Sequence, residues 1–280
     1  MRNKILFVHT ENLNFFYRLN RELNHLKIKF KILSKNSKIP DIPSLLITTT
    51  GEIHNFRDNY KNLKILAYAE SENFKYYILK VLAAYRIDYK EHYSDLIFSI
   101  DPGLKQVGLV VFLDDYYLIS HTVYEITELI DFIKDCVNCF QNDNPTLLNL
   151  TFKFGGGVLT LTLKLIEQII DVFQDRNNLK IYLIDESKSS KIRIQDIKKR
   201  LRTKHELSAL ILALRSGVEI TDLNLFKTTK HGKLLDFNNL KHNEKFVKLV
   251  NESIVEVKDI IEKILTNQIS LSQSSRLINK

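Results

Sequence analysis

The sequence predicts an α/β protein in which two α/β units are followed by a helical tail. Three observations lead to this fold class. Strand-like and helical stretches alternate over the first 90 residues, three strand-like stretches follow one another over 96–123, and strands and helices then alternate to residue 215. A chain of 280 residues is long enough for one large or two modest domains, each with its own core. We place the domains at 1–92, 93–220 and 221–280.

The first unit shows strand and helix patterns in turn. Strands are expected at 4–8, 28–33, 45–49 and 63–67, and helices at 12–26 and 72–85. Strands that alternate with helices through short connections form mainly parallel sheets, so residues 1–92 are predicted to be a small Rossmann-like α/β domain. The segment has no GxGxxG motif or phosphate-binding glycine loop. We therefore expect a structural or interaction role for it.

The second unit begins with three consecutive strands. These are expected at 96–100, 107–113 and 117–123, with a hairpin turn at Asp114-Asp115. The elements that follow are a helix at 127–141, a strand at 147–153, a helix at 160–173, a strand at 180–184, and helices at 192–201 and 204–215. Three antiparallel strands followed by β/α units are the order of a ribonuclease H-like core, which we predict here. The tail is predicted as a polar linker, a helix ending near Leu265, and a Ser/Gln-rich end that frays.

Charge and composition narrow the class of partner. The net charge of +8 and the pI near 9.2 favour a polyanion, with nucleic acid first and an anionic membrane surface second. The apolar runs are too short to span a membrane and the first residues lack a signal-peptide pattern, so we expect a cytoplasmic protein without a membrane partner. Cys136 and Cys139 lack the second ligand pair of a zinc site and are expected to be buried in a helix.

Acidic residues stand at the ends of predicted strands in the second unit. Asp101 ends its first strand, Asp185 and Glu186 end its last strand, and Glu206 lies in the first turn of its final helix. In a ribonuclease H-like order these positions converge at one edge of the sheet. Carboxylates gathered in this way bind Mg²⁺ or Mn²⁺, which prefer hard oxygen ligands. Two such ions can activate water and stabilise the leaving oxygen of a phosphodiester.

Three segments resemble motifs of RuvC-type Holliday junction resolvases and of the YqgF branch of that superfamily. Residues 99–111 resemble the first-strand motif, and Asp185-Glu-Ser-Lys-Ser-Ser190 is similar to the YqgF motif Asp-Glu-x-x-Thr-Thr. Glu206-Leu-Ser-Ala-Leu-Ile-Leu212 resembles the final-helix motif. In addition, Lys153-Phe-Gly-Gly-Gly157 stands where YqgF proteins have a glycine-bearing loop. The resemblance covers about residues 95–218.

The resemblance implies a metal-dependent endonuclease that hydrolyses branched or structured nucleic acid, with structured DNA as the expected substrate. It implies Asp101, Glu186 and Glu206 as metal ligands, with Asp185 as a further catalytic residue or the alternative middle ligand. The chain departs from the family at Glu206, where an aspartate is usual, and in a fourth strand without an acid. His205 is either an aid to proton transfer or a polar residue at a helix start.

Resolvases of this type act as dimers, because a four-way junction has two strands to cut. The apolar tail positions are open to two interpretations, a homodimer contact or packing on the core of the same chain. These positions are Ile254, Val257, Ile261 and Leu265.

A dense run of basic residues lies between the last two acidic motifs. Such a run is typical of phosphate contacts, although a solvated helix face is the alternative. The run consists of Lys188, Lys191, Arg193, Lys198, Lys199, Arg200, Arg202 and Lys204. Tyr116, Tyr117 and Phe154 are candidates either for stacking on unpaired bases or for core packing.

Two other function classes stay open. One is a nucleic-acid-binding protein with a degenerate nuclease core. The other is an actin/sugar-kinase-like ATP-binding protein, which shares the strand-Asp-x-Gly start. That fold needs a late adenosine-binding glycine motif, and after residue 217 the chain has Gly232 alone.

Overall fold

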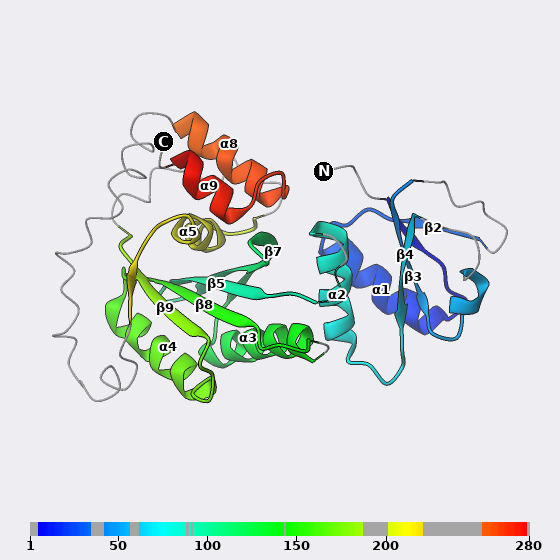
Figure 1. Ribbon diagram of the computed structural model, residues 1–280, viewed down its shortest axis with the longest axis horizontal. Coiled ribbons are helices and arrows are strands. Elements are labelled where there is room, and N and C mark those ends of the chain that lie inside the picture. The colour runs from blue at the N-terminus through cyan, green and yellow to red at the C-terminus, as the bar shows by residue number, and fades with distance from the viewer. Residues whose placement is uncertain are drawn as a thin grey trace. The chain divides into compact units, whose positions relative to one another are not determined.

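The computed structural model describes residues 5–34, 42–56, 62–87, 90, 92–142, 144–186, 201–220 and 254–278. The chain divides into two compact units, Met1–Glu91 and His92–Lys280, and each contains its own sheet (Figure 1). The protein is thus a mixed α/β protein. Among the described helices, none is long and apolar enough to cross a membrane.

The first unit is built on four parallel strands in the order β2-β1-β3-β4. The strands are β1 (Ile5–Val8), β2 (Lys31–Ile32), β3 (Ser44–Thr49) and β4 (Leu63–Tyr68). The helices are α1 (Leu13–His25) and α2 (Phe74–Arg86), with one 3₁₀ turn, η1, at Ile53–Phe56. The predicted strands and helices of this unit are confirmed, as is the parallel sheet, although β2 is shorter than predicted.

Both helices of the first unit pack on the same face of its sheet. Phe15 of α1 stacks on Tyr68 of β4 with ring centroids 5.0 Å apart, and Tyr77 of α2 meets both rings edge-on. Neighbouring residues on a strand point to opposite faces of the sheet. The face away from the two helices carries a smaller cluster around Phe7 and Leu46. The side of α1 that faces away from the sheet is exposed.

The second unit is built on six strands in the order β10-β9-β8-β5-β6-β7. The strands are β5 (Asp95–Pro102), β6 (Val107–Leu113), β7 (Tyr116–Val123), β8 (Asn149–Gly155), β9 (Leu179–Ile184) and β10 (Val218–Glu219). Strand β6 is antiparallel to both of its neighbours, β5 and β7, whereas β8 and β9 run parallel to β5. Asp114 and Asp115 have φ values of 46° and 73°, as a two-residue type I′ hairpin requires, so the predicted turn is confirmed.

Helices cover both faces of this sheet. Helices α3 (Ile126–Gln141) and α4 (Leu159–Val172) lie on one face, and α5 (Lys204–Ala213) lies on the other (Figure 1). Helices α8 (Ile254–Leu265) and α9 (Leu271–Ile278) cover α5 on its outer side, so α5 is buried on nearly all sides. Cys136 and Cys139 are buried in α3, as expected.

The tail belongs to the core of the second unit. Val257, Ile261 and Leu265 are buried in one cluster with α5, which leaves them unavailable for a dimer contact. The side chain of Ile254 lies outside the described residues. The expectation of a frayed end is wrong, because residues 271–278 form α9. The first turn of α9 is held by Asp115, whose carbonyl oxygen accepts the N–H of Leu271 at 2.8 Å.

Candidate active site

Strand alternation places Asp101 on the face of the sheet that α5 covers. Residues two apart on a strand share a face. Ile97 packs against the α5 cluster, and the Ser99 hydroxyl donates to the backbone carbonyl of Ala209 in α5 at 2.7 Å. Asp101 continues this row at the carboxyl end of β5, where its side chain is 10% exposed. The apolar pattern of β5 therefore aims the acid at α5.

Gly108 allows the start of α5 to lie against the sheet. This glycine pairs with Asp101 in the β5–β6 ladder. A Cβ atom added at Gly108 would overlap the backbone carbonyl of His205. The glycine of the first-strand motif thus serves a close approach between a strand and a helix backbone.

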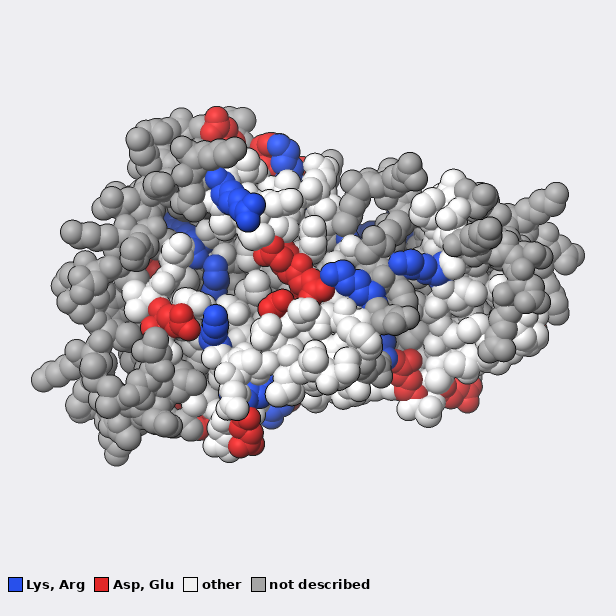
Figure 2. Space-filling model, viewed as in Figure 1, with Lys and Arg blue, Asp and Glu red and all other residues white. Residues whose placement is uncertain are grey.

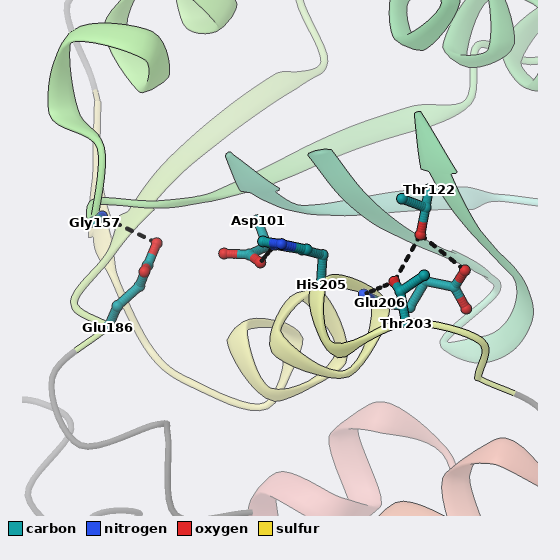
Figure 3. Close-up of polar contacts among 7 residues, drawn as sticks. All are labelled: Asp101, Thr122, Gly157, Glu186, Thr203, His205 and Glu206. Atoms are coloured by element: carbon teal, nitrogen blue, oxygen red, sulfur yellow. Dashed lines mark hydrogen bonds and ion pairs between the residues drawn. The ribbon is translucent and has the colours of Figure 1, made fainter. Parts of the chain in front are cut away.

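The first turn of α5 directs His205 toward Asp101. The helix is capped by Thr203, whose hydroxyl oxygen accepts the N–H of Glu206 at 3.2 Å. His205 is two residues past the cap, and its Nδ1 lies 2.8 Å from Oδ2 of Asp101. Figure 3 shows the two side chains meeting end to end. They form a partly buried hydrogen-bonded pair.

Glu206, which was predicted to be a metal ligand, points the other way (Figure 3). Its side chain is buried and accepts hydrogen bonds from Ser120 Oγ at 2.7 Å and Thr122 Oγ1 at 3.0 Å, both on β7. It also accepts the backbone N–H of Arg202 at 3.0 Å. The carboxylate is occupied in holding the start of α5 to β7.

This placement corrects the predicted group of Asp101, Glu186 and Glu206. Successive helix residues point about 100° apart, so His205 and Glu206 cannot both face Asp101. Within the described part of the chain, no three His, Cys, Asp or Glu side chains form a group that could hold a metal ion. The structure pairs Asp101 with His205, and the charge of Asp101 acts on Glu186, which is described next.

Glu206→Gln is therefore expected to act on stability and to leave any cleavage by the folded protein intact. The NH₂ group of the new amide would face a hydrogen-bond donor that now bonds to the carboxylate. Losing that hydrogen bond would lower the free energy of unfolding by roughly 1–3 kcal/mol. Thermal unfolding monitored by circular dichroism, together with a cleavage assay well below the melting temperature, would measure both effects. An unchanged melting temperature together with lost cleavage would show that Glu206 takes part in the reaction.

Glu186 reaches the site from the end of β9. The backbone N–H of Gly157 donates to its Oε1 at 3.0 Å, and a Cβ atom at Gly155 or Gly157 would overlap its carboxylate. The glycine-bearing loop after β8 is thus shaped around this side chain. In Figure 3 the carboxylates of Glu186 and Asp101 lie on the same side of the first turn of α5 and face one another.

The two carboxylates share an electrostatic environment that opposes their ionisation. Burial raises the pKa of Asp101, although the hydrogen bond to His205 and the charges of His205 and Lys204 act against this. Burial also raises the pKa of Glu186, and the negative charges of Asp101 and Asp185 add to this effect, whereas the Gly157 hydrogen bond and Arg215 oppose it. A cation between them would favour the ionised forms of both.

The charges of Asp185 and Arg215 both act on Glu186. The guanidinium of Arg215, which follows α5, donates from Nη1 to the backbone carbonyl of Asp185 at 2.6 Å. Of the two acids that the motif left open, Glu186 is drawn in Figure 3, where its carboxylate faces Asp101.

Lys153 holds the other end of α5. Its ammonium donates to the carbonyl oxygens of Ala213 at 2.6 Å and Arg215 at 3.0 Å, where the helix dipole is negative. Burial lowers its pKa to about 8. With Thr203 at the start of the helix and Lys153 at its end, α5 is fixed along its axis.

Most of the predicted basic run lies outside the described residues. These positions are Lys188, Lys191, Arg193, Lys198, Lys199 and Arg200. Arg202 and Lys204 are described and exposed, and the charge of Lys204 acts on Asp101. Among the described residues on the face that Figure 2 shows, Lys and Arg side chains are spread among acidic ones.

The aromatic candidates for base stacking are corrected in part. Tyr117 and Phe154 are buried in the core and cannot reach a base, whereas Tyr116 is partly exposed. Strand alternation explains Phe154, because Lys153 and Gly155 on either side of it face α5.

The sequence left the role of His205 open, although it contains a pattern that indicates where this side chain points. Thr203-Lys-His-Glu206 matches the S/T-x-x-E pattern of a capping box ahead of an apolar run. That pattern gives Glu206 a structural role at the helix start and leaves His205 to face elsewhere. Lys153 and Arg215 had no local signal, because their partners are backbone carbonyls distant in sequence.

Comparisons with known proteins do not assign a family. No family model matches the chain, and no curated protein matches it. A crystal structure of Aa-Ago, an Argonaute protein, with externally bound siRNA is similar over 65% of this chain and 35% of that one, at 12% identity and a TM-score of 0.22. The Ppx/GppA phosphatase of Aquifex aeolicus, in its type II variant, is similar over 59% of this chain and 63% of that one, at 10% identity and a TM-score of 0.14.

The chain therefore spans about a third of the Argonaute chain and less than two thirds of the phosphatase. With TM-scores this low, neither likeness establishes a fold or a function.

Proposed function

We propose that the protein is a metal-dependent phosphodiesterase that cleaves structured nucleic acid through Asp101, Glu186 and His205. The observation that carries the proposal is the Asp101–His205 pair, which faces Glu186 at the carboxyl ends of β5 and β9. The strand order supports a ribonuclease H-like core, since three antiparallel strands are followed by two parallel ones with connecting helices.

The donor set fits one Mg²⁺ or Mn²⁺ ion. Asp101 and Glu186 supply hard oxygen ligands, and the pKa of each is raised by burial, with the negative charge of Asp101 adding to the effect on Glu186. A divalent cation would relieve both effects. Glu206 is committed to β7, so we propose a site for one ion held by these two carboxylates rather than the two-ion site implied by the resemblance.

The protein groups have distinct roles in the proposed reaction. When bound, the ion supplies Lewis-acid polarisation of a phosphate oxygen. Ionised Asp101 accepts the Nδ1 proton of His205, which leaves Nε2 free of a proton and able to accept one from an attacking water. This tautomer follows from the acceptor-only nature of a carboxylate. Exposed Lys204 adds positive charge for the substrate phosphate.

A second candidate is a nucleic-acid-binding protein that does not cleave. It is favoured by the small number of ligands, because the described residues provide no group of three metal-binding side chains. In that case the Asp101–His205 hydrogen bond would only stabilise the packing of α5 on the sheet.

The test is to incubate purified full-length protein with labelled four-way junction, flap, duplex and single-stranded substrates, with Mg²⁺, Mn²⁺ or EDTA. We expect cleavage that needs a metal ion and an accompanying rise in melting temperature on adding that ion. An ion at 100 times its Kd stabilises the folded state by about 2.7 kcal/mol. Nucleic-acid binding without cleavage and without a thermal shift would select the second candidate.

A further inference from the structure

Glu186 lies just beyond the regular part of its sheet. The ladder between β8 and β9 ends at the pair Gly155 and Ile184, and among the described strands none pairs with β9 beyond Ile184. The carboxylate of Glu186 accepts the backbone N–H of Gly157 at 3.0 Å. A side chain that binds a cation also needs a fixed backbone, and strand pairing does not provide it at this position.

The guanidinium of Arg215 provides a contact to that backbone. Its Nη1 donates to the carbonyl oxygen of Asp185, one residue before Glu186, at 2.6 Å. Arg215 is only 1% exposed, and the charges of Asp185 and Glu186 both act on it. Because arginine keeps its proton in proteins, a buried positive charge is fixed at the acidic end of β9.

The backbone of Arg215 is itself fixed on both sides. The ammonium of Lys153 on β8 donates to its carbonyl oxygen at 3.0 Å and to that of Ala213 at 2.6 Å. Two residues further on, an added Cβ atom at Gly217 would overlap the backbone carbonyl of Leu183, so this glycine lets the chain lie against β9. Strand β10 then pairs with β9. The end of α5 is thus tied to both strands.

We propose that Arg215 is a positioning residue for Glu186 and acts through the backbone carbonyl of Asp185. This role rests on the proposed function, since it takes Glu186 as a ligand of the divalent cation. Gly157 fixes the carboxylate and Arg215 fixes the backbone that carries it, so Glu186 faces Asp101 before a cation binds. Hydrogen bonds that orient metal-binding residues from outside typically contribute roughly 10- to 100-fold to metal affinity. A merely structural role at the end of α5 would change stability alone.

The test measures the Mn²⁺ affinity of full-length variants from the electron paramagnetic resonance signal of free Mn²⁺, at a temperature where each variant is folded. Arg215→Gln removes the charge and shortens the donor, so it should weaken Mn²⁺ binding roughly 10- to 100-fold. Hydrogen exchange of the metal-free protein should become faster over residues 181–186, because that backbone loses a hydrogen bond. Arg215→Lys keeps a cationic donor and should restore most of the affinity.

Arg176→Gln is the matched control. Arg176 also donates to a backbone carbonyl, that of Leu148 at 3.1 Å, but at the opposite end of β8. This variant should lose stability and keep the wild-type affinity for Mn²⁺. An equal loss of affinity in Arg176→Gln, wild-type affinity in Arg215→Gln, or an Arg215→Lys variant no better than Arg215→Gln would each overturn the proposal.

Two further variants complete the test. If Arg215→Gln does not fold, Lys153→Met releases the carbonyl of Arg215 without changing its guanidinium and should weaken Mn²⁺ binding in the same direction. Wild-type affinity in Lys153→Met would then overturn the proposal. Binding that is lost in Asp101→Asn but unchanged in Arg215→Gln contradicts the role of Arg215 alone. A wild-type protein that binds no Mn²⁺ contradicts the proposed function, and this role with it.

Discussion

Asp101→Asn is expected to lower cleavage by about 10³-fold or more while leaving the melting temperature unchanged or higher. Asparagine has the size of aspartate but lacks the negative charge that binds a cation. Its NH₂ group also cannot accept the Nδ1 proton of His205, so it does not stabilise the tautomer in which Nε2 carries no proton. Because burial raises the pKa of Asp101, the ionised acid costs stability that the neutral amide does not.

The same pKa shifts predict how stability depends on pH. The folded-state pKa values of Asp101 and Glu186 lie above their unfolded values. At a pH between the unfolded and the folded pKa, the folded state therefore binds more protons than the unfolded state. Their contribution to stability is therefore lost as pH rises through that window. Asp101→Asn should flatten this decline in metal-free buffer, whereas Asp131→Asn, at an exposed position of α3, should not. Retained cleavage in Asp101→Asn would remove this residue from the mechanism, and a lower melting temperature would show that its charge is stabilising.

Gly108→Ala is expected to reduce both stability and cleavage, although it changes no reacting group. The added Cβ would overlap the backbone carbonyl of His205, so the first turn of α5 must move away from β6. Displacements of this kind cost roughly 1–3 kcal/mol in a packed core, or several degrees in melting temperature for a unit of this size. The movement also separates His205 from Asp101, so cleavage should fall in the folded protein.

Gly51→Ala is the matched control, because its added Cβ meets no atom within 4 Å and its φ is not in the left-handed region. It should behave as the wild type. A folded Gly108→Ala that retains its metal-induced thermal shift but loses cleavage would assign the loss to His205, because the carboxylates of Asp101 and Glu186 stay in place. Wild-type stability and cleavage in Gly108→Ala would mean that α5 does not rest on β6 as described.

The order of strands and helices could be predicted because each element carries its own local pattern. Strand β6 occupies Val107–Leu113, as predicted, because its apolar run is bounded by turn residues on both sides. The Asp114-Asp115 hairpin followed from two residues that tolerate positive φ. α9 was missed because its serine-rich sequence has little helical preference, and contacts with Asp115 and the α5 cluster stabilise it instead.

The sequence by itself determined which acids stand at strand ends, and it placed Asp101 and Glu186 at one edge of a sheet. Only the tertiary structure decided that His205, and not the neighbouring Glu206, completes the pair with Asp101. The physical reason is rotational: neighbouring residues on a helix differ by about 100°, and the packing of α5 on Gly108 and β7 sets which one faces the site. The capping-box spacing of Thr203 and Glu206 indicates that Glu206 serves the helix start, but it does not say which residue meets Asp101. That is set by the hydrogen bonds of Ser120 and Thr122 to Glu206.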